Sequence, residues 1–189
     1  MNHIDLYLSE VVEVANLINR DKILEFAKAI ATIRDNNGRL FFVGVGGSAG
    51  NCSHAVNDFR KIVGVESYAA TDNVSELTAR INDDGWDTCF SKWLEGSKIN
   101  DNDAIVVFSV GGGTENTSFN IVKAIDYAKE QKAKVLSIVS RGGGHSFEKS
   151  DVCILIPTNL TNPRITPHAE EWQGIIWHLV VNLLHEGKC

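Results

Sequence analysis

The chain has 189 residues, enough for one domain with a sizeable core, and its composition of 43% hydrophobic and 22% charged residues is that of a soluble globular protein. Its net charge of -6 argues against a nucleic-acid partner or an anionic membrane surface, because no general basic field attracts phosphate groups. A small anionic ligand, which needs only a few local donors, remains compatible with this charge.

Two amphipathic helices are expected at the start of the chain, over 4–19 and 21–36. Apolar residues recur there every three or four positions, as on the buried stripe of a helix. Asn37-Gly38 then ends the second helix. We expect residues 1–36 to form a helical hairpin, and their apolar stripe makes them a candidate for a subunit interface.

Short apolar strands alternate with helices from residue 39 onward. The expected strands are 39–44, 66–70, 104–110, 133–140 and 151–157, and the expected helices are 48–63, 73–82, 117–131 and about 167–186. Such alternation is typical of parallel strands that helices bury on both faces. We therefore predict one α/β domain over 1–189, a three-layer doubly wound sheet of five parallel strands.

The ends of the sequence and its cysteines bear on the cellular compartment. The amino-terminal segment is amphipathic and acidic, without the basic start and apolar run of a secretory signal. No apolar stretch approaches the roughly 20 residues that span a bilayer. The four cysteines are far apart and form no CxxC pair, so they indicate neither a disulfide framework nor a thiolate zinc site. We expect a cytoplasmic protein with no membrane partner.

A glycine-rich loop follows the first predicted strand, at the edge of the sheet where ligands bind in this architecture. Gly46, Gly47 and Ser48 stand at a helix start, where free N–H groups and the positive end of the helix dipole favour an anion. A tight turn with Ser48 as the N-cap is the purely structural alternative. One such loop alone does not decide between the two interpretations.

Similar loops follow two further strands. The second runs from Ser109 through three glycines that begin at Gly111, and hydroxyl residues follow it at Thr114, Thr117 and Ser118. Two such loops together favour a phosphate site. Neither has the lysine of a P-loop or the spacing of a dinucleotide site, so a small phosphorylated ligand fits better than a nucleotide. In the third loop, Arg141 either aids anion binding or is an ordinary exposed loop arginine.

Histidines and carboxylates recur on two of the predicted helices. His54 and Asp58 are four residues apart, so they share one helix face. The last helix carries Glu170, Glu171 and His178, and spacing alone places Glu171 nearer to the azimuth of His178. Two such helices could together build a zinc-type N/O site or an acid–base pair. A surface ion pair and a core histidine are the structural alternatives.

The chain resembles the sugar isomerase (SIS) domain family, and within it the phosphoheptose isomerases, over nearly its whole length. The motifs that carry the resemblance are GVGGSAGNCSHAVNDF (44–59), the Asn82-Asp83 pair, SVGGGTENTS (109–118) and TPHAEEWQGIIWH (166–178). The resemblance implies a ketose–aldose isomerase that converts sedoheptulose 7-phosphate to D-glycero-D-manno-heptose 7-phosphate. The alternatives are an isomerase of another sugar phosphate and a non-catalytic, regulatory sugar-phosphate-binding protein.

The resemblance also assigns the site. It implies Asp58 and His178 as catalytic residues and zinc, or another divalent metal, as the cofactor. The implied metal ligands are His54, Asp58, Glu170 and His178, and the implied substrate-binding residues are Gly46, Gly47, Ser48, Asp83, Ser109, Gly111, Thr114, Ser118 and Gln173. Family members are homotetramers whose sites lie between subunits, so we expect the same assembly here.

Three positions depart from the usual family pattern. Val45 stands where the first loop normally has asparagine, which removes a polar contact with the ligand. Asp58 stands where glutamate is usual and is one methylene shorter. Glu170 stands where many members have glutamine, and its added negative charge is expected to strengthen a divalent cation site.

Overall fold

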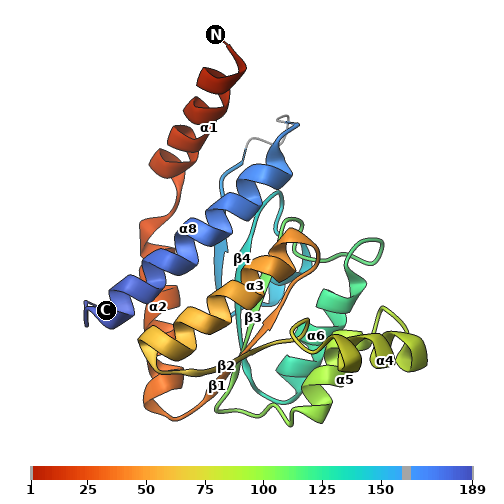
Figure 1. Cartoon of the computed structure of the whole chain (residues 1–189). Helices are drawn as coiled ribbons and strands as arrows, with labels where there is room; N and C mark the ends of the chain where they lie inside the picture. The colour runs from red at the N-terminus through yellow and green to blue at the C-terminus, as the bar shows by residue number, and fades with distance from the viewer. Residues whose placement is uncertain (1, 159–162, 189) are drawn as a thin grey trace.

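A five-stranded, all-parallel sheet forms the centre of the computed structural model, which describes residues 2–158 and 163–188 (Figure 1). The strands are β1 (Arg39–Val43), β2 (Glu66–Ala69), β3 (Ala104–Ser109), β4 (Lys134–Val139) and β5 (Val152–Leu155). They lie in the order β2-β1-β3-β4-β5, and each neighbouring pair is parallel. The predicted fold class is confirmed.

Helices cover both faces of this sheet. They are α1 (His3–Leu17), α2 (Arg20–Asp35), α3 (Gly47–Asp58), α4 (Val74–Asp84), α5 (Cys89–Gly96), α6 (Phe119–Glu130), α7 (Gly144–Lys149) and α8 (Ile165–His185). The helix predicted over 48–63 changes type at its midpoint, because Phe59–Val63 continues α3 as a π-helix. Within residues 2–158 and 163–188, no helix combines the length and apolar character that crossing a membrane requires.

Two hydrophobic cores make the fold three-layered. Successive side chains of a strand point to opposite faces of a sheet. Leu40 and Phe42 of β1 accordingly pack in one core, beneath α2, α3 and α8. Phe41 and Val43 belong to a second core, beneath α5 and α6. Because both faces of the central strands are buried, β1, β3 and β4 form a rigid base for the loops at their carboxyl ends.

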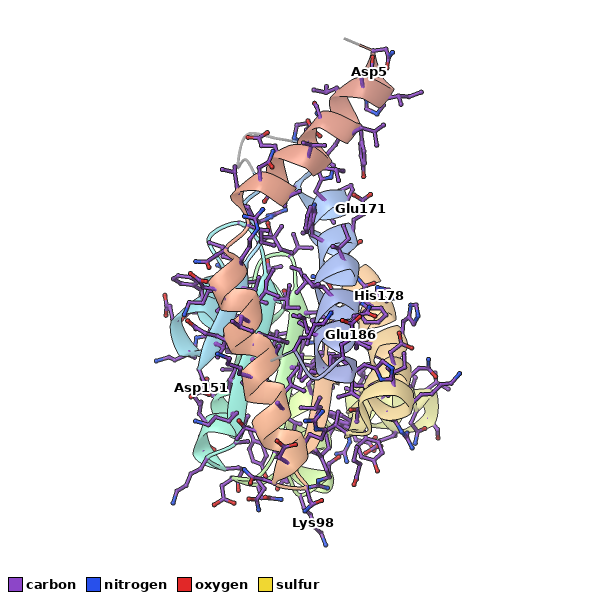
Figure 2. All side chains as sticks on the ribbon, turned by 90° about the vertical axis from the view of Figure 1, so that its left-hand side faces the viewer. Asp5, Lys98, Asp151, Glu171, His178 and Glu186 are labelled. Carbon is purple, nitrogen blue, oxygen red and sulfur yellow. The ribbon has the colours of Figure 1, made fainter. Side chains whose placement is uncertain are left out.

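The two amino-terminal helices do not form the expected hairpin. Figures 1 and 2 show α1 and α2 following one another in nearly the same direction, with α1 projecting beyond the body of the domain. Ile18 and Asn19, the two residues between the helices, have extended backbone angles, so the chain does not reverse. The amphipathic pattern predicted both helices correctly but carried no information on the angle between them.

The sheet register brings three glycine-rich loops to one edge. Val43 pairs with Val107 at the end of β1, and Ser109 pairs with Val139 at the end of β3. The loops that follow β1, β3 and β4 therefore meet. Helices α3 and α8 pack against each other on the same face of the sheet, in contact along their length (Figure 1). This arrangement determines where the candidate site residues lie.

Candidate active site

A cavity lined by hydroxyl groups lies where the three loops meet. Its volume is about 190 Å³, and its lining consists of Val45, Ser48, Ser109, Val110, Gly111, Thr117, Ser118, Arg141 and Thr166. Four of the residues predicted to bind substrate, Ser48, Ser109, Gly111 and Ser118, therefore come together here. Thr114 lines an adjoining cavity of about 440 Å³ that shares Gly111, Thr117, Ser118 and Arg141 with the first.

Local hydrogen bonds hold these loops in place. Gly46 is the N-cap residue of α3, and Ser48 is almost completely buried at the start of that helix. The Ser109 hydroxyl accepts a hydrogen bond of 3.0 Å from the Gly112 N–H. The Thr114 hydroxyl accepts one of 3.1 Å from the Thr117 N–H. The serine and threonine side chains thus shape the loops as well as lining them.

The second and third loops interlock through their glycines. A β-carbon on Gly112 would lie 1.8 Å from the Gly143 carbonyl oxygen, so only glycine fits there. The His145 N–H donates to the Gly113 carbonyl at 2.9 Å, and the Ser146 N–H donates to the Gly112 carbonyl at 3.0 Å. The start of α7 is therefore tied to the loop that follows β3.

His54, Asp58 and His178 form a compact group on the outer face of α3 and α8. Each offers a ligand atom, and these atoms all lie within 4.8 Å of one another. Both histidines are exposed and Asp58 is half-buried. The shared helix face predicted for His54 and Asp58 is present, and α8 supplies the third member.

Neighbouring groups fix the orientation of the two histidine rings. The His178 Nδ1 lies 2.7 Å from the Gly174 carbonyl oxygen. Because a carbonyl can only accept, Nδ1 carries the proton and Nε2 keeps its lone pair for a metal or a proton. The His54 ring packs edge-on against Trp177, with the ring centroids 4.7 Å apart.

Glu170 does not join this group within one chain. Its carboxylate lies beside Gly47, at the start of α3: a β-carbon on Gly47 would be 2.4 Å from Oε2. Glu170 and His178 are eight residues apart, which is about 12 Å along an α-helix. The four-ligand set predicted from the sequence is therefore reduced to three in the single chain.

Glu171 belongs to a contact with α1 and not to the histidine group. It accepts hydrogen bonds from Tyr7 and from the buried His168, which also lies 2.7 Å from Glu10. Figure 2 shows Glu171 on the α1 side of α8, with His178 further along the helix. The hydrogen bond with Glu171, with burial as a smaller cause, raises the pKa of Tyr7 to about 12.

Four predicted substrate-binding residues do not line the cavities: Gly46 and Gly47 directly precede Ser48, whereas Gln173 and Asp83 lie further away. Gln173 is fully buried, and its Oε1 accepts a 3.1 Å hydrogen bond from Asn51 of α3. It is packed into the α3–α8 contact, where its Nε2 has no hydrogen-bond partner among the described residues, and its contact with substrate stays a prediction. Asp83 is exposed near the end of α4, on the opposite side of the molecule from α8 (Figure 1). One chain does not bring Asp83 to the other residues.

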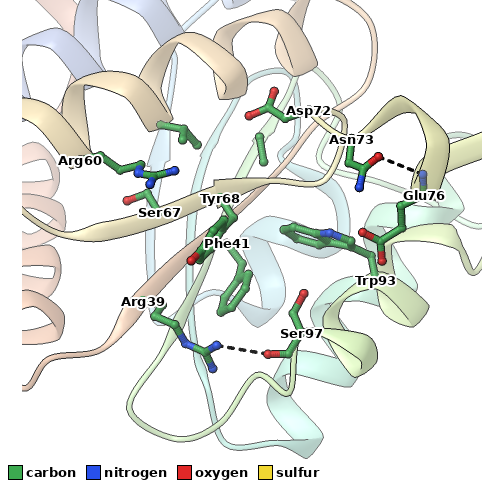
Figure 3. A pocket seen from close by; sticks show the side chains of 12 residues that line it. Arg39, Phe41, Arg60, Ser67, Tyr68, Asp72, Asn73, Glu76, Trp93 and Ser97 are labelled. Carbon is green, nitrogen blue, oxygen red and sulfur yellow. Dashed lines mark hydrogen bonds between the residues drawn. The ribbon is translucent and has the colours of Figure 1, made fainter.

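A larger hollow beside β2 contains none of the predicted site residues. It measures about 470 Å³ and is shown in Figure 3. Asp72 and Glu76 line it together with Arg39 and Arg60, so its charges are mixed. Arg39 is already engaged by Asp103 and by the Ser97 carbonyl. The mixed charges of this hollow therefore do not favour an anionic ligand.

Comparison with known proteins identifies the family. A sequence model of the SIS domain matches residues 6–140. The chain belongs to the SIS domain family. A phosphoheptose isomerase from Sulfurimonas denitrificans is 30% identical over 181 residues, covering 93% of this chain and 87% of the relative. One from Akkermansia muciniphila is 32% identical over 162 residues, covering 81% and 78%.

A solved structure supports the same assignment. The phosphoheptose isomerase GmhA from Neisseria gonorrhoeae matches this SIS domain protein with a TM-score of 0.84 at 25% identity, over 97% of each chain. The resemblance to phosphoheptose isomerases inferred from the motifs is therefore confirmed.

The histidine group of this SIS domain protein has the chemistry of a divalent metal site. Two imidazoles and one carboxylate, with ligand atoms within 4.8 Å, are a donor set that suits zinc. Catalytic zinc sites use three protein ligands and leave a fourth position for water or substrate. Three ligands without Glu170 thus fit a catalytic site better than a closed structural one.

Thr166 lines the SIS cavity but was not among the residues predicted to bind substrate. Thr166 is the second residue of α8, one position before Pro167, and lines the same cavity as Ser48. A hydroxyl residue before proline at a helix start reads as ordinary turn chemistry, so it gave no functional signal. Only the packing of α8 against the loops reveals its position.

Proposed function

We propose that this chain is a ketose–aldose isomerase that converts sedoheptulose 7-phosphate to D-glycero-D-manno-heptose 7-phosphate. The observation that carries the proposal is the presence, in a SIS domain, of both a hydroxyl-lined cavity and an ordered group of two histidines and a carboxylate. The cavity suits a phosphate, and the group suits proton transfer at a carbonyl. A purely sugar-phosphate-binding protein needs only the first.

The phosphate is held at the loops after β1 and β3. Ser48, Ser109 and Ser118 offer hydroxyl donors around a cavity of about 190 Å³. The amino-terminal end of α3 faces the same loops, and free N–H groups at a helix start stabilise an anion. Binding the phosphate there leaves the carbonyl end of the sugar to be placed by the catalytic group.

The reaction moves one proton between carbons and one between oxygens. Asp58 takes the proton from C1 and leaves an enediolate, and His178 moves the O1 proton to O2 through Nε2. Asp58 then delivers its proton to C2, and C1 becomes the aldehyde carbon. The Gly174 carbonyl holds the His178 ring so that Nε2 is the reactive nitrogen.

Zinc is the proposed cofactor, with His54, Asp58 and His178 as ligands. When bound, it supplies Lewis-acid polarisation of the substrate carbonyl. A carboxylate bound to a metal is a weaker base than a free one, and the His178 Nε2 cannot bind the metal and carry a proton at the same time, so His178 shuttles the proton only while it is not a ligand. The two roles assigned to Asp58 can therefore be separated. Loss of a base lowers turnover alone, whereas loss of a ligand lowers both turnover and metal affinity.

A homotetramer in the cytoplasm, with sites between subunits, completes the proposal. The outer stripe of α1 supports it, since Ile4, Leu8 and Val12 are 69%, 58% and 59% exposed and lie one turn apart. The double variant Leu8→Glu, Val12→Glu should dissociate the assembly, and light scattering measures the change in molecular mass. Glu13→Gln, at a solvent-facing position of the same helix, is the control. A monomeric wild-type protein would contradict the proposed assembly.

The decisive experiment is an isomerisation assay over ketose phosphates of five to seven carbons. Asp58→Asn and His178→Gln should each lower turnover of sedoheptulose 7-phosphate by about 100-fold or more. Asp101→Asn and His185→Gln, at exposed positions outside both cavities and the histidine group, are the matched controls.

The outcomes separate the rival functions. Turnover of a different ketose phosphate would replace the substrate and keep the mechanism. Tight binding of sedoheptulose 7-phosphate without any turnover would favour a regulatory binding protein. Wild-type rates in both Asp58→Asn and His178→Gln would overturn the assignment of the catalytic group.

A further inference from the structure

Arg141 is the one ionisable side chain in the lining of the hydroxyl cavity and of the cavity that adjoins it. Both linings consist otherwise of serine, threonine, valine and glycine residues. Hydroxyl and backbone N–H groups solvate a phosphate but do not neutralise it. The protein as a whole carries a net charge of -6, so a phosphate that enters this cavity has only Arg141 to balance its charge locally.

Arg141 also differs from the other arginines in having no partner of its own. Its side chain is exposed, and it makes no hydrogen bond, ion pair or ring contact with any residue in 2–158 or 163–188. Each of the other six has such a contact: Arg20, Arg34, Arg39, Arg60, Arg80 and Arg164. The guanidinium of Arg141 is therefore available to a ligand without breaking an existing interaction.

Arg141 has a backbone conformation that is unfavourable for residues other than glycine. Its φ is 53°, in the left-handed region, although three glycines follow directly and tolerate that region without cost. A β-carbon makes this region unfavourable for a non-glycine residue. Asn37, Lys98, Ser118 and Lys132 share this backbone region, and of these five residues only Ser118 and Arg141 line the cavities.

The Arg141 loop is fixed relative to the cavity on both sides. Before it, the Ser140 N–H donates to the Val110 carbonyl at 3.1 Å. After it, the Gly143 N–H donates to the Ser140 carbonyl at 2.9 Å, and the start of α7 is bonded to Gly112 and Gly113. The arginine is thus anchored to the same loop that presents Ser109 and Gly111.

We propose that Arg141 is a phosphate-binding residue of this site, whose guanidinium closes the hydroxyl cavity over the phosphate and supplies its counter-charge. The inference rests on the proposed function, because it requires the substrate phosphate to bind in this cavity. A guanidinium donates two parallel N–H bonds to phosphate oxygens, which lysine does not. Arg141 therefore sets the preference for a phosphorylated over an unphosphorylated sugar and takes no part in the proton transfers.

The test measures binding of inorganic phosphate by calorimetry, without reference to turnover. Arg141→Gln should weaken phosphate binding by about 10- to 100-fold, as expected for loss of a charged hydrogen-bond partner. Arg141→Lys should recover only part of the loss. Lys132→Gln is the matched control, since Lys132 is exposed, has a φ of 63° and lies in the turn before β4, outside both cavities.

Kinetics give a second readout. Arg141→Gln should raise KM for sedoheptulose 7-phosphate by a similar factor and leave kcat within about threefold, because the residue acts on binding alone. A loss confined to kcat would overturn the proposal, as would wild-type phosphate affinity in Arg141→Gln.

The Ser109→Ala and Ser118→Ala variants separate this inference from the function on which it rests. Weaker phosphate binding in the serine variants, with wild-type affinity in Arg141→Gln, leaves the cavity as the phosphate site and removes only Arg141. If the wild-type protein and both serine variants show the same negligible phosphate affinity, the placement of the phosphate fails, and Arg141 with it.

Discussion

The carboxylate of Glu170 lies against Gly47, so close that a β-carbon on Gly47 would be 2.4 Å from Oε2. A larger residue at position 47 would displace the end of the Glu170 side chain, which α8 brings onto the first residue of α3. The carboxylate consequently lies near the positive end of the α3 dipole, beside the cavity that contains Ser48.

Glu170→Gln should therefore strengthen phosphate binding. The resident negative charge at the start of α3 opposes a bound phosphate, and charges at a helix end are worth about 0.3–1 kcal/mol, a factor of about two to five in affinity. Calorimetry with inorganic phosphate measures the change. Glu130→Gln at the end of α6 removes the same charge far from the loops, and an equal gain in that control would show a general charge effect.

Zinc binding should depend on three residues and not on Glu170. His54→Ala and His178→Ala should each lower zinc affinity by at least about 100-fold, since each removes a direct ligand. Glu170→Gln should stay near the wild-type value. Competition with a chelating dye measures all three. A loss in Glu170→Gln equal to that in His54→Ala would mean that Glu170 of another chain completes the site.

Asp103→Asn should destabilise the fold more than any surface charge change. Asp103 is 1% exposed and accepts hydrogen bonds from Arg39 and from the Asn100 N–H and side chain. Removing the charged acceptor costs about 1.5–3 kcal/mol, because Asp103 is buried whereas the Arg39 side chain is partly exposed to water. Urea unfolding measures the loss. Asp35→Asn, which breaks the exposed pair with Arg34, should change the unfolding free energy little.

Spectroscopic titration of Tyr7 should report the docking of α1 on α8. The hydrogen bond with Glu171 raises the pKa of Tyr7 to about 12, against about 10 in the unfolded chain. Because the folded pKa is raised, this contact stabilises the fold below about pH 10 and is lost as the pH rises towards 12. The difference in phenolate absorbance between the wild type and Tyr7→Phe isolates the titration of Tyr7. This absorbance should appear near pH 12 in the wild type and at a lower pH in Glu171→Gln.

Periodicity predicted the sheet and most helices because apolar residues at regular spacing must face a core. It missed α5, of eight residues, and α7, of six, since such short helices show barely two turns of pattern. Among site residues, His54 and Asp58 were predictable because their spacing lies within one helix. The positions of Glu170, Glu171 and Gln173 were not, because the phase of α8 depends on what packs against it.

Helix α8 links parts of the molecule that are otherwise independent. It is one unbroken run of 21 residues, about 31 Å long, with Thr166 at the cavity, Glu170 over Gly47 and His178 in the histidine group. Its first turns are also bonded to α1 through Glu10 and Tyr7. A displacement of α8 at the α1 contact would therefore reach Thr166, Glu170 and His178 along a single helix.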